Sequence, residues 1–176
     1  LLPAGDLAEG DVILGLASSG VHSNGYSLVR RILRLDEDSS PLGTTHSKLG
    51  QTLGEALLRP HRAYYHAVRP VFSLVKGMAH ITGGGLPGNL NRMLPDDVDA
   101  VIDTNSWKIP AIFDFLEHHG AIEREEMYRV FNMGLGMVAI CQEGDLDAVQ
   151  LAVADAVVVG RIVTRIGDEP ILLQRT

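Results

Sequence analysis

At residues 18–30 the chain reads SSGVHSNGYSLVR, a polar, glycine-bearing turn between two expected elements. The apolar run at 11–17 before this turn predicts a buried strand. After the turn, apolar residues recur at helical spacing on one side and arginines lie on the other, which predicts an amphipathic helix. The apolar set is Leu28, Val29, Ile32 and Leu35, and the basic set is Arg30, Arg31 and Arg34.

The composition of this turn suits an anion such as phosphate. The first turn of a helix leaves backbone N–H groups unpaired and carries the positive end of the helix dipole. Gly20 and Gly25 permit backbone conformations that a side chain resists, and His22 titrates near neutral pH. Further donors come from Ser18, Ser19, Ser23 and Asn24. Serine, asparagine and glycine are also common in ordinary helix caps, so a structural turn stays open as an alternative.

A second informative stretch is MAHITGGGLPGNLNRML at residues 78–94. An expected short strand meets three consecutive glycines, and a helix is predicted to begin near Pro87, a residue favoured at the first helical position. Three adjacent glycines are entropically costly, which indicates that the backbone approaches another group closely there. A flexible hairpin or linker is the alternative.

The rest of the chain alternates irregularly between expected strands and helices. Strands are predicted at 98–103, 137–140, 157–163 and 170–174, and helices at 51–58, 61–76 with a kink at Pro70, 110–118, 122–131 and 145–155. We expect residues 36–48 to form a mobile loop or flap, and residues 1–10 to be a linker remnant before one domain at 11–176. Because there is no dinucleotide-binding or Walker motif, the sequence predicts one layered α+β domain rather than a Rossmann unit.

Composition restricts the class of partner. The formal charge of −7 argues against nucleic-acid and anionic membrane surfaces, and no apolar run reaches the roughly 20 residues of a membrane span. Cys141 lies in an apolar run and is predicted to be a buried, inert thiol, which fits a reducing compartment. Four of the seven histidines, His46, His61, His66 and His80, lie in the middle third of the chain without a metal-ligand spacing, so we interpret these four as scattered surface residues and expect no metal ligands. The chain does not begin with Met, which suggests a piece of a longer protein.

Three stretches in this order carry a family resemblance: SSGVHSNGYSLV at 18–29, AHITGGG at 79–85 and MYRVFNMGLGM at 127–137. Together they resemble the C-terminal domain of the phosphoribosylformylglycinamidine cyclo-ligase family, the aminoimidazole ribonucleotide synthetases of purine biosynthesis. The likeness runs from about Leu7 to the end of the chain. It implies a layered α/β sandwich with a mixed, largely antiparallel sheet.

The resemblance implies an ATP-dependent ligase that uses Mg²⁺ to convert formylglycinamidine ribonucleotide into aminoimidazole ribonucleotide, ADP and phosphate. The formyl oxygen would be activated by phosphorylation before an internal nitrogen attacks and phosphate leaves. In this family an N-terminal domain, which this chain lacks, supplies most ATP and Mg²⁺ contacts and most of the homodimer interface. We therefore expect a cytoplasmic enzyme whose substrate cleft lies between the two domains, and an isolated chain that is inactive.

The resemblance also assigns site residues. Those expected to line the cleft and bind phosphate are Ser19, Gly20, His22, Ser23, Asn24 and Gly25, with Thr82, Gly83, Gly84 and Gly85 as a second wall and Asn132 and Gly134 in support. His22 and His80 are the candidate catalytic residues, polarising the substrate or carrying a proton. Formylglycinamidine ribonucleotide synthetase, selenophosphate synthetase, thiamine monophosphate kinase and the hydrogenase maturation factor share the expected architecture and stay open, as do a non-catalytic phosphate-binding domain and a purely structural domain.

Overall fold

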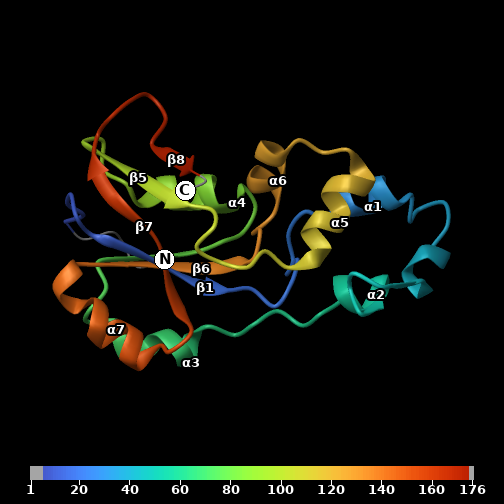
Figure 1. Ribbon diagram of the computed structural model, residues 1–176, viewed down its shortest axis with the longest axis horizontal. Helices are drawn as coiled ribbons and strands as arrows, with labels where there is room; N and C mark the ends of the chain where they lie inside the picture. Colours follow the sequence, from blue (N-terminus) through green and yellow to red (C-terminus); the bar gives the residue numbers. More distant parts are fainter. Residues whose placement is uncertain (1–5, 175–176) are drawn as a thin grey trace.

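A six-stranded sheet forms the centre of the computed structural model, which describes residues 6–174 (Figure 1). Its strands, in spatial order, are β4 (Gly77–His80), β6 (Leu135–Cys141), β1 (Val12–Ala17), β7 (Ala156–Thr164), β5 (Val98–Asp103) and β8 (Ile171–Gln174). Neighbouring strands are antiparallel except for β5 and β8, which are parallel. This confirms the predicted α+β fold with a mixed, largely antiparallel sheet. Residues 1–5 of the predicted linker lie outside the described residues.

Helices cover both faces of the sheet and also form a lobe beyond one end of it (Figure 1). One face carries α4 (Gly85–Leu90) and the other carries α3 (Tyr65–Val68) and α7 (Leu146–Ala152). The helical lobe contains α1 (Tyr26–Leu33), α2 (Leu53–Leu57), α5 (Ala111–Gly120) and α6 (Arg124–Val130). Single 3-10 turns are η1 (Ser40–Gly43), η2 (Arg69–Val71), η3 (Asn91–Met93) and η4 (Glu143–Asp145).

Alternation along the central strand β1 explains the two cores that flank the sheet. Successive side chains of a strand point to opposite faces. Ile13 therefore packs in the core beneath α4 with Leu86, whereas Leu14 packs on the other face with Val68 and Val149. All five of these side chains are almost completely buried.

Phe131 connects the helical lobe to the sheet. It is fully buried at the end of α6, and its ring lies 5.9 Å from that of Phe113 in α5, measured between centroids. The short segment from Phe131 to Leu135 then enters β6, the neighbour of β1. The third motif of the sequence therefore lies next to the turn that follows β1.

The helix predicted at 61–76 is wrong over most of its length. Only α3 and the 3-10 turn η2 form there, and residues 58–64 are not helical. Pro70 lies in η2 and has no N–H to donate, which ends the regular α-helix after one turn. The loop predicted at 36–48 also contains structure, since η1 is followed by β2 (Thr45–His46), which pairs with β3 (Gln51–Thr52).

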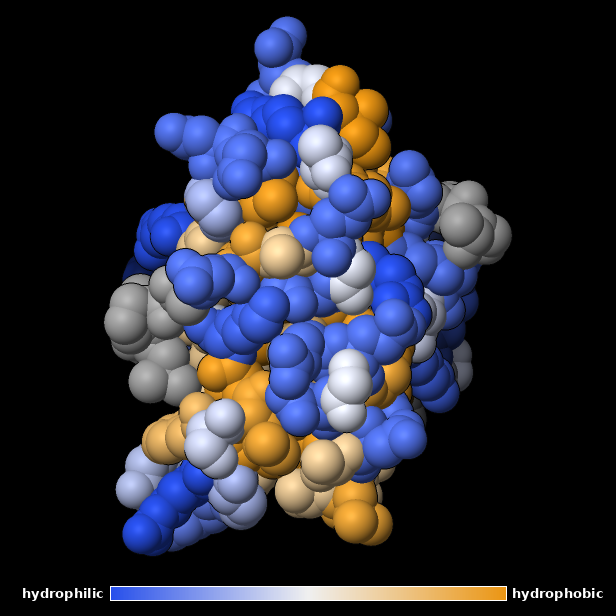
Figure 2. Space-filling model, turned by 90° about the vertical axis from the view of Figure 1, so that its left-hand side faces the viewer, coloured by the Kyte–Doolittle hydropathy of each residue, from blue (hydrophilic) through white to orange (hydrophobic). Residues whose placement is uncertain are grey.

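The end of the molecule opposite the helical lobe presents a mostly hydrophilic surface, with hydrophobic residues in its lower part, at the height of α3 and α7, and also near its top (Figure 2). None of the helices in residues 6–174 is long and apolar enough to cross a membrane. Cys141 is buried in β6, and this burial raises the pKa of its thiol, which confirms the interpretation of Cys141 as a buried cysteine.

Candidate functional site

The turn between β1 and α1 is held by the side chain of Asn132, which is 2% exposed. Its Nδ2 donates to the carbonyl oxygens of Gly20 and Val21 at 2.9 and 3.1 Å. Its Oδ1 accepts from the Ser18 hydroxyl and the Gly134 amide, each at 2.9 Å. Because both ends of the amide are used within the protein, Asn132 supports the turn rather than offering a group to a ligand.

A second buried asparagine, Asn89 in α4, holds the loop at 82–85 in the same manner. Its Nδ2 donates to the carbonyl oxygen of Gly85 at 2.7 Å and to that of Thr82 at 3.2 Å. The Thr82 hydroxyl donates to its Oδ1 at 3.1 Å. The shapes of both loops are thus fixed by amide side chains behind them.

The three sequence motifs pack directly against one another, and two glycines make this possible. Gly25 has φ +80°, and a Cβ there would lie 2.3 Å from the Phe131 ring. Gly85 has φ +61°, and a Cβ there would lie 1.8 Å from the Tyr128 carbonyl oxygen. Both conformations favour glycine, and neither position has room for a side chain.

The exposed groups of the two loops share one surface. Ser23 is exposed and Asn24 half-buried, and neither side chain makes a hydrogen bond to any described residue. Gly83 lies beside Asn24, since a Cβ on Gly83 would be 3.9 Å from Asn24 Oδ1. Gly83 and Gly84 are exposed, and their backbone amides have no partner among residues 6–174. The free donors predicted for an anion therefore gather where the two loops meet.

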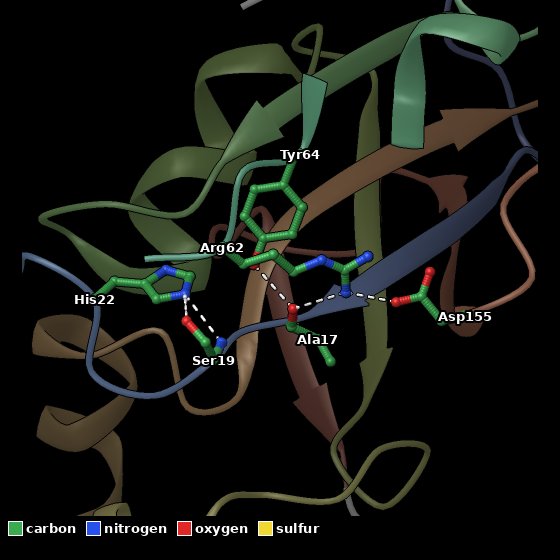
Figure 3. Close-up of polar contacts among 6 residues, drawn as sticks. All are labelled: Ala17, Ser19, His22, Arg62, Tyr64 and Asp155. Carbon is green, nitrogen blue, oxygen red and sulfur yellow. Dashed lines mark hydrogen bonds and ion pairs between the residues drawn. The ribbon is translucent and has the colours of Figure 1, made fainter. Parts of the chain in front are cut away.

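The segment Pro60–Tyr64, here called the strap, crosses the turn that follows β1 (Figure 3). The Ser19 hydroxyl donates to the Pro60 carbonyl oxygen at 2.7 Å. Arg62 Nη1 and the Tyr64 hydroxyl both donate to the Ala17 carbonyl oxygen, at 3.2 and 2.9 Å. The Ser19 hydroxyl is thereby used within the protein.

Arg62 in the strap also forms an ion pair with Asp155 (Figure 3). Its hydrogen bond to Asp155 lowers the pKa of that carboxyl. Burial raises the pKa of the Tyr64 phenol to about 12, so the hydroxyl stays a donor.

His22 is buried in the turn, with a φ of +62° and 5% of its surface exposed. Its Nε2 accepts from the Ser19 amide at 3.0 Å (Figure 3). Space for the ring exists because position 136 is a glycine, where a Cβ would lie 2.6 Å from His22 Cε1. Burial, followed by the charges of His61, His80 and Arg62, lowers the pKa of His22 to about 4, so this ring is neutral at pH 7.

The interpretation of four histidines as scattered residues is wrong for His61 and His80, which come together with His22. His61 from the strap and His80 at the end of β4 place their Nε2 atoms 3.0 Å apart. The rings of His22 and His61 lie 3.9 Å apart between centroids. Burial, and then the charge of His61, also lowers the pKa of His80. Sequence reasoning named His22 and His80 but did not identify His61 as their neighbour.

Two hollows flank the turn. The larger, of about 340 Å³, lies beside the strap and is lined mainly by aromatic and apolar residues, with His61, Arg62 and His80 among them. The smaller, of about 100 Å³, lies between Ser19, Gly20 and Arg59.

Mg²⁺ prefers oxygen ligands, carboxylates above all. Among residues 6–174, three potential metal ligands come close to one another: His22, His61 and His80. All three offer nitrogen donors. The described residues of this chain therefore do not fit the Mg²⁺ that the family resemblance implies.

A family model described as AIR synthase related protein, C-terminal domain, matches residues 8–171. The chain belongs to this family. Its motifs at 18–29, 79–85 and 127–137 all lie within the matched range, which confirms the resemblance read from the sequence.

This chain aligns with only part of the length of its named relatives. The phosphoribosylformylglycinamidine cyclo-ligase of Anaeromyxobacter sp. (strain Fw109-5) is 48% identical over 169 residues, which make up 92% of this chain and 48% of that protein. The one from Burkholderia cenocepacia (strain HI2424) is 46% identical over 173 residues, or 95% of this chain and 46% of that protein. The chain thus spans about half the length of the relatives it matches.

Solved structures at low identity share the fold. A hydrogenase maturation protein HypE superposes with a TM-score of 0.64 at 13% identity, covering 99% of this chain and 52% of that one. PurL of T. maritima, complexed with FGAR, gives a TM-score of 0.55 at 16% identity over 99% of this chain and 27% of that one. These likenesses confirm the architecture.

Proposed function

We propose that this domain forms the substrate side of the active-site cleft in an ATP-dependent cyclo-ligase that converts formylglycinamidine ribonucleotide to aminoimidazole ribonucleotide. The observation that carries the proposal is the shared surface of the two loops, where Ser23, Asn24, Gly83 and Gly84 present unpaired donors. The identity of 46–48% to relatives named as this cyclo-ligase supports the reaction. An N-terminal half of the same protein would bind ATP and Mg²⁺, complete the cleft and form the homodimer of a cytoplasmic enzyme.

The loops are suited to hold a phosphate group of the substrate. Each charge-assisted hydrogen bond contributes roughly 1.5–3 kcal/mol, and glycine amides allow the oxygens to come close. The buried asparagines behind the loops keep the donors in place before the substrate arrives, which lowers the entropic cost of binding. His22 is neutral at pH 7, so it can accept a proton but cannot act as an imidazolium that donates one. The catalytic roles of His22 and His80 stay predictions.

The experiment is an ADP-release assay on the full-length protein that contains this chain, with formylglycinamidine ribonucleotide as substrate. We expect turnover by the full-length protein and none by residues 1–176 alone. An absence of turnover in the full-length protein would contradict the assignment of the reaction.

A double variant tests the loop surface. Changing Ser23→Ala together with Asn24→Ala removes two free donors, and we expect KM for the nucleotide substrate to rise at least about 10-fold. The matched control is Ser73→Ala, because Ser73 is exposed on the segment after η2 and belongs to neither loop. Equal KM values for the double variant and the control would show that the substrate does not bind at this surface.

A further inference from the structure

Three histidines from separate parts of the chain come together, and two of them, His61 and His80, also line the larger hollow. His22 comes from the turn after β1, His61 from the strap and His80 from the end of β4. One ring nitrogen of each lies within 4.8 Å of the others. We propose that His22, His61 and His80 form a binding site for a transition-metal ion with the ligand preferences of Zn²⁺.

The lone pair of His61 already points into the cluster. Its Nδ1 lies 2.7 Å from the Arg62 carbonyl oxygen, which can only accept, so Nδ1 carries the hydrogen. Nε2 is therefore the bare nitrogen, and it faces His80 Nε2 at 3.0 Å. A histidine whose second nitrogen donates to a backbone carbonyl is the usual arrangement around a metal ion, because that bond fixes the tautomer and the ring orientation.

His22 contributes a buried nitrogen that lacks a partner. The side chain is 95% buried, and its Nδ1 makes no hydrogen bond to any of residues 6–174. Buried polar atoms are nearly always paired, so such an atom calls for a ligand. Because Nε2 accepts from the Ser19 amide, Nδ1 carries the hydrogen in this structure. Binding a metal through Nδ1 moves that hydrogen to Nε2, which then donates to the Ser19 hydroxyl at 3.1 Å, and the Ser19 amide gives up its acceptor.

The donor set and its spacing favour zinc. Three imidazoles without a carboxylate or thiolate suit Zn²⁺ and its neighbours in the first row, and do not suit Mg²⁺ or Ca²⁺. Zn–N bonds of about 2.0–2.1 Å in a tetrahedron place ligand nitrogens about 3.4 Å apart. The His61–His80 pair, at 3.0 Å, is close to this spacing, and all three nitrogens lie within 4.8 Å of one another.

The surroundings leave room for a fourth ligand and offset the nearest positive side chain. The hollow of about 340 Å³ lined by His61 and His80 gives water access to a fourth coordination position. The nearby guanidinium of Arg62 is paired with Asp155, so its charge is offset. A metal ion here would join the strap to β4 and to the turn after β1.

The test measures Zn²⁺ and Co²⁺ binding by the chelator-treated, full-length protein, using competition with a chromophoric chelator. We expect one tight site per chain, with the visible absorption of tetrahedral Co²⁺ when cobalt is bound. His61→Ala should weaken Zn²⁺ binding at least about 100-fold, since it removes a ligand from an exposed position and leaves the buried residues in place. His66→Ala is the matched control, because His66 is exposed in α3 outside the cluster.

His80→Ala is a second, independent variant and should also weaken binding at least about 100-fold. Loss of the tight site in both cluster variants and its retention in His66→Ala would support the metal site. Absence of a tight site in the unaltered protein, equal affinity in His61→Ala, or equal loss in His66→Ala would each overturn it. Because metal binding is read without any turnover, its failure is distinct from a failure of the proposed reaction.

Discussion

Replacing Asn132 by alanine should destabilise the domain by about 4 kcal/mol. The side chain makes four hydrogen bonds, to Ser18, Gly20, Val21 and Gly134, and each contributes about 1 kcal/mol. Burial leaves water little access to the groups that lose their partner, since Asn132 is 2% exposed. A loss of this size is a large fraction of the 5–15 kcal/mol that stabilises an ordinary domain.

Urea unfolding of this chain, followed by the fluorescence of its single tryptophan, measures the change. Trp107 is a local reporter, because its indole N–H donates to the Met133 carbonyl oxygen at 2.8 Å. With an m-value of about 2 kcal/mol/M, the midpoint should fall by about 2 M.

Two further variants make the Asn132 measurement specific. Asn132→Asp keeps the acceptor but places a carboxylate oxygen against the carbonyls of Gly20 and Val21, so it should lose at least as much stability as Asn132→Ala. Asn91→Ala, at an exposed position of η3, should stay within about 0.5 kcal/mol of the unaltered chain. A loss under 1 kcal/mol for Asn132→Ala, or full stability of Asn132→Asp, would refute the role of this side chain in holding the turn.

Two other predictions concern a glycine and an ion pair. Gly85→Ala should lower the free energy of unfolding in urea by roughly 3 kcal/mol or more, because its Cβ would meet the Tyr128 carbonyl oxygen at 1.8 Å. Gly88→Ala in the same helix has open space and should be neutral or stabilising. Equal effects of the two variants would contradict the packing argument. Asp155→Asn should lower stability at pH 7 by no more than about 1 kcal/mol, since the pair with Arg62 is partly exposed. The pKa of Asp155 is lowered in the folded state, so its contribution is present above the unfolded pKa of about 3.9 and is lost as pH falls through the folded pKa. A difference from Asp155→Asn that does not shrink as the pH is lowered below about 3.9 would contradict this cause.

Elements with strong local patterns could be predicted from the sequence. The strand predicted at 98–103 is β5, Val98–Asp103, and the turn at 18–25 does join a strand to a helix. The helix predicted at 61–76 failed because contacts distant in sequence decide its first part. Arg62 and Tyr64 bond to the carbonyl oxygen at the end of β1, which holds the strap out of a helix.

The candidate site was likewise predictable only where its residues are consecutive in the sequence. Glycines and small polar residues marked both loops, since their chemistry is visible in consecutive residues. Asn89 was not identified, because an asparagine inside a helix looks ordinary until its amide is seen to bond back to the loop. His61 was missed for a related reason, as its contact with His80 depends on how the strap crosses the end of β4.

The structure also changes the reason why glycines occur in the motifs. The sequence suggested that glycines let a ligand approach the backbone, and the exposed Gly83 and Gly84 remain suited to that. Gly25 and Gly85 instead let the three motifs touch each other, at the Phe131 ring and the Tyr128 carbonyl oxygen. The donors at the loop surface are therefore held by packing that exists without any ligand. The entropy cost of ordering these donors is therefore met during folding, so less of the binding free energy is lost to ordering when the substrate binds.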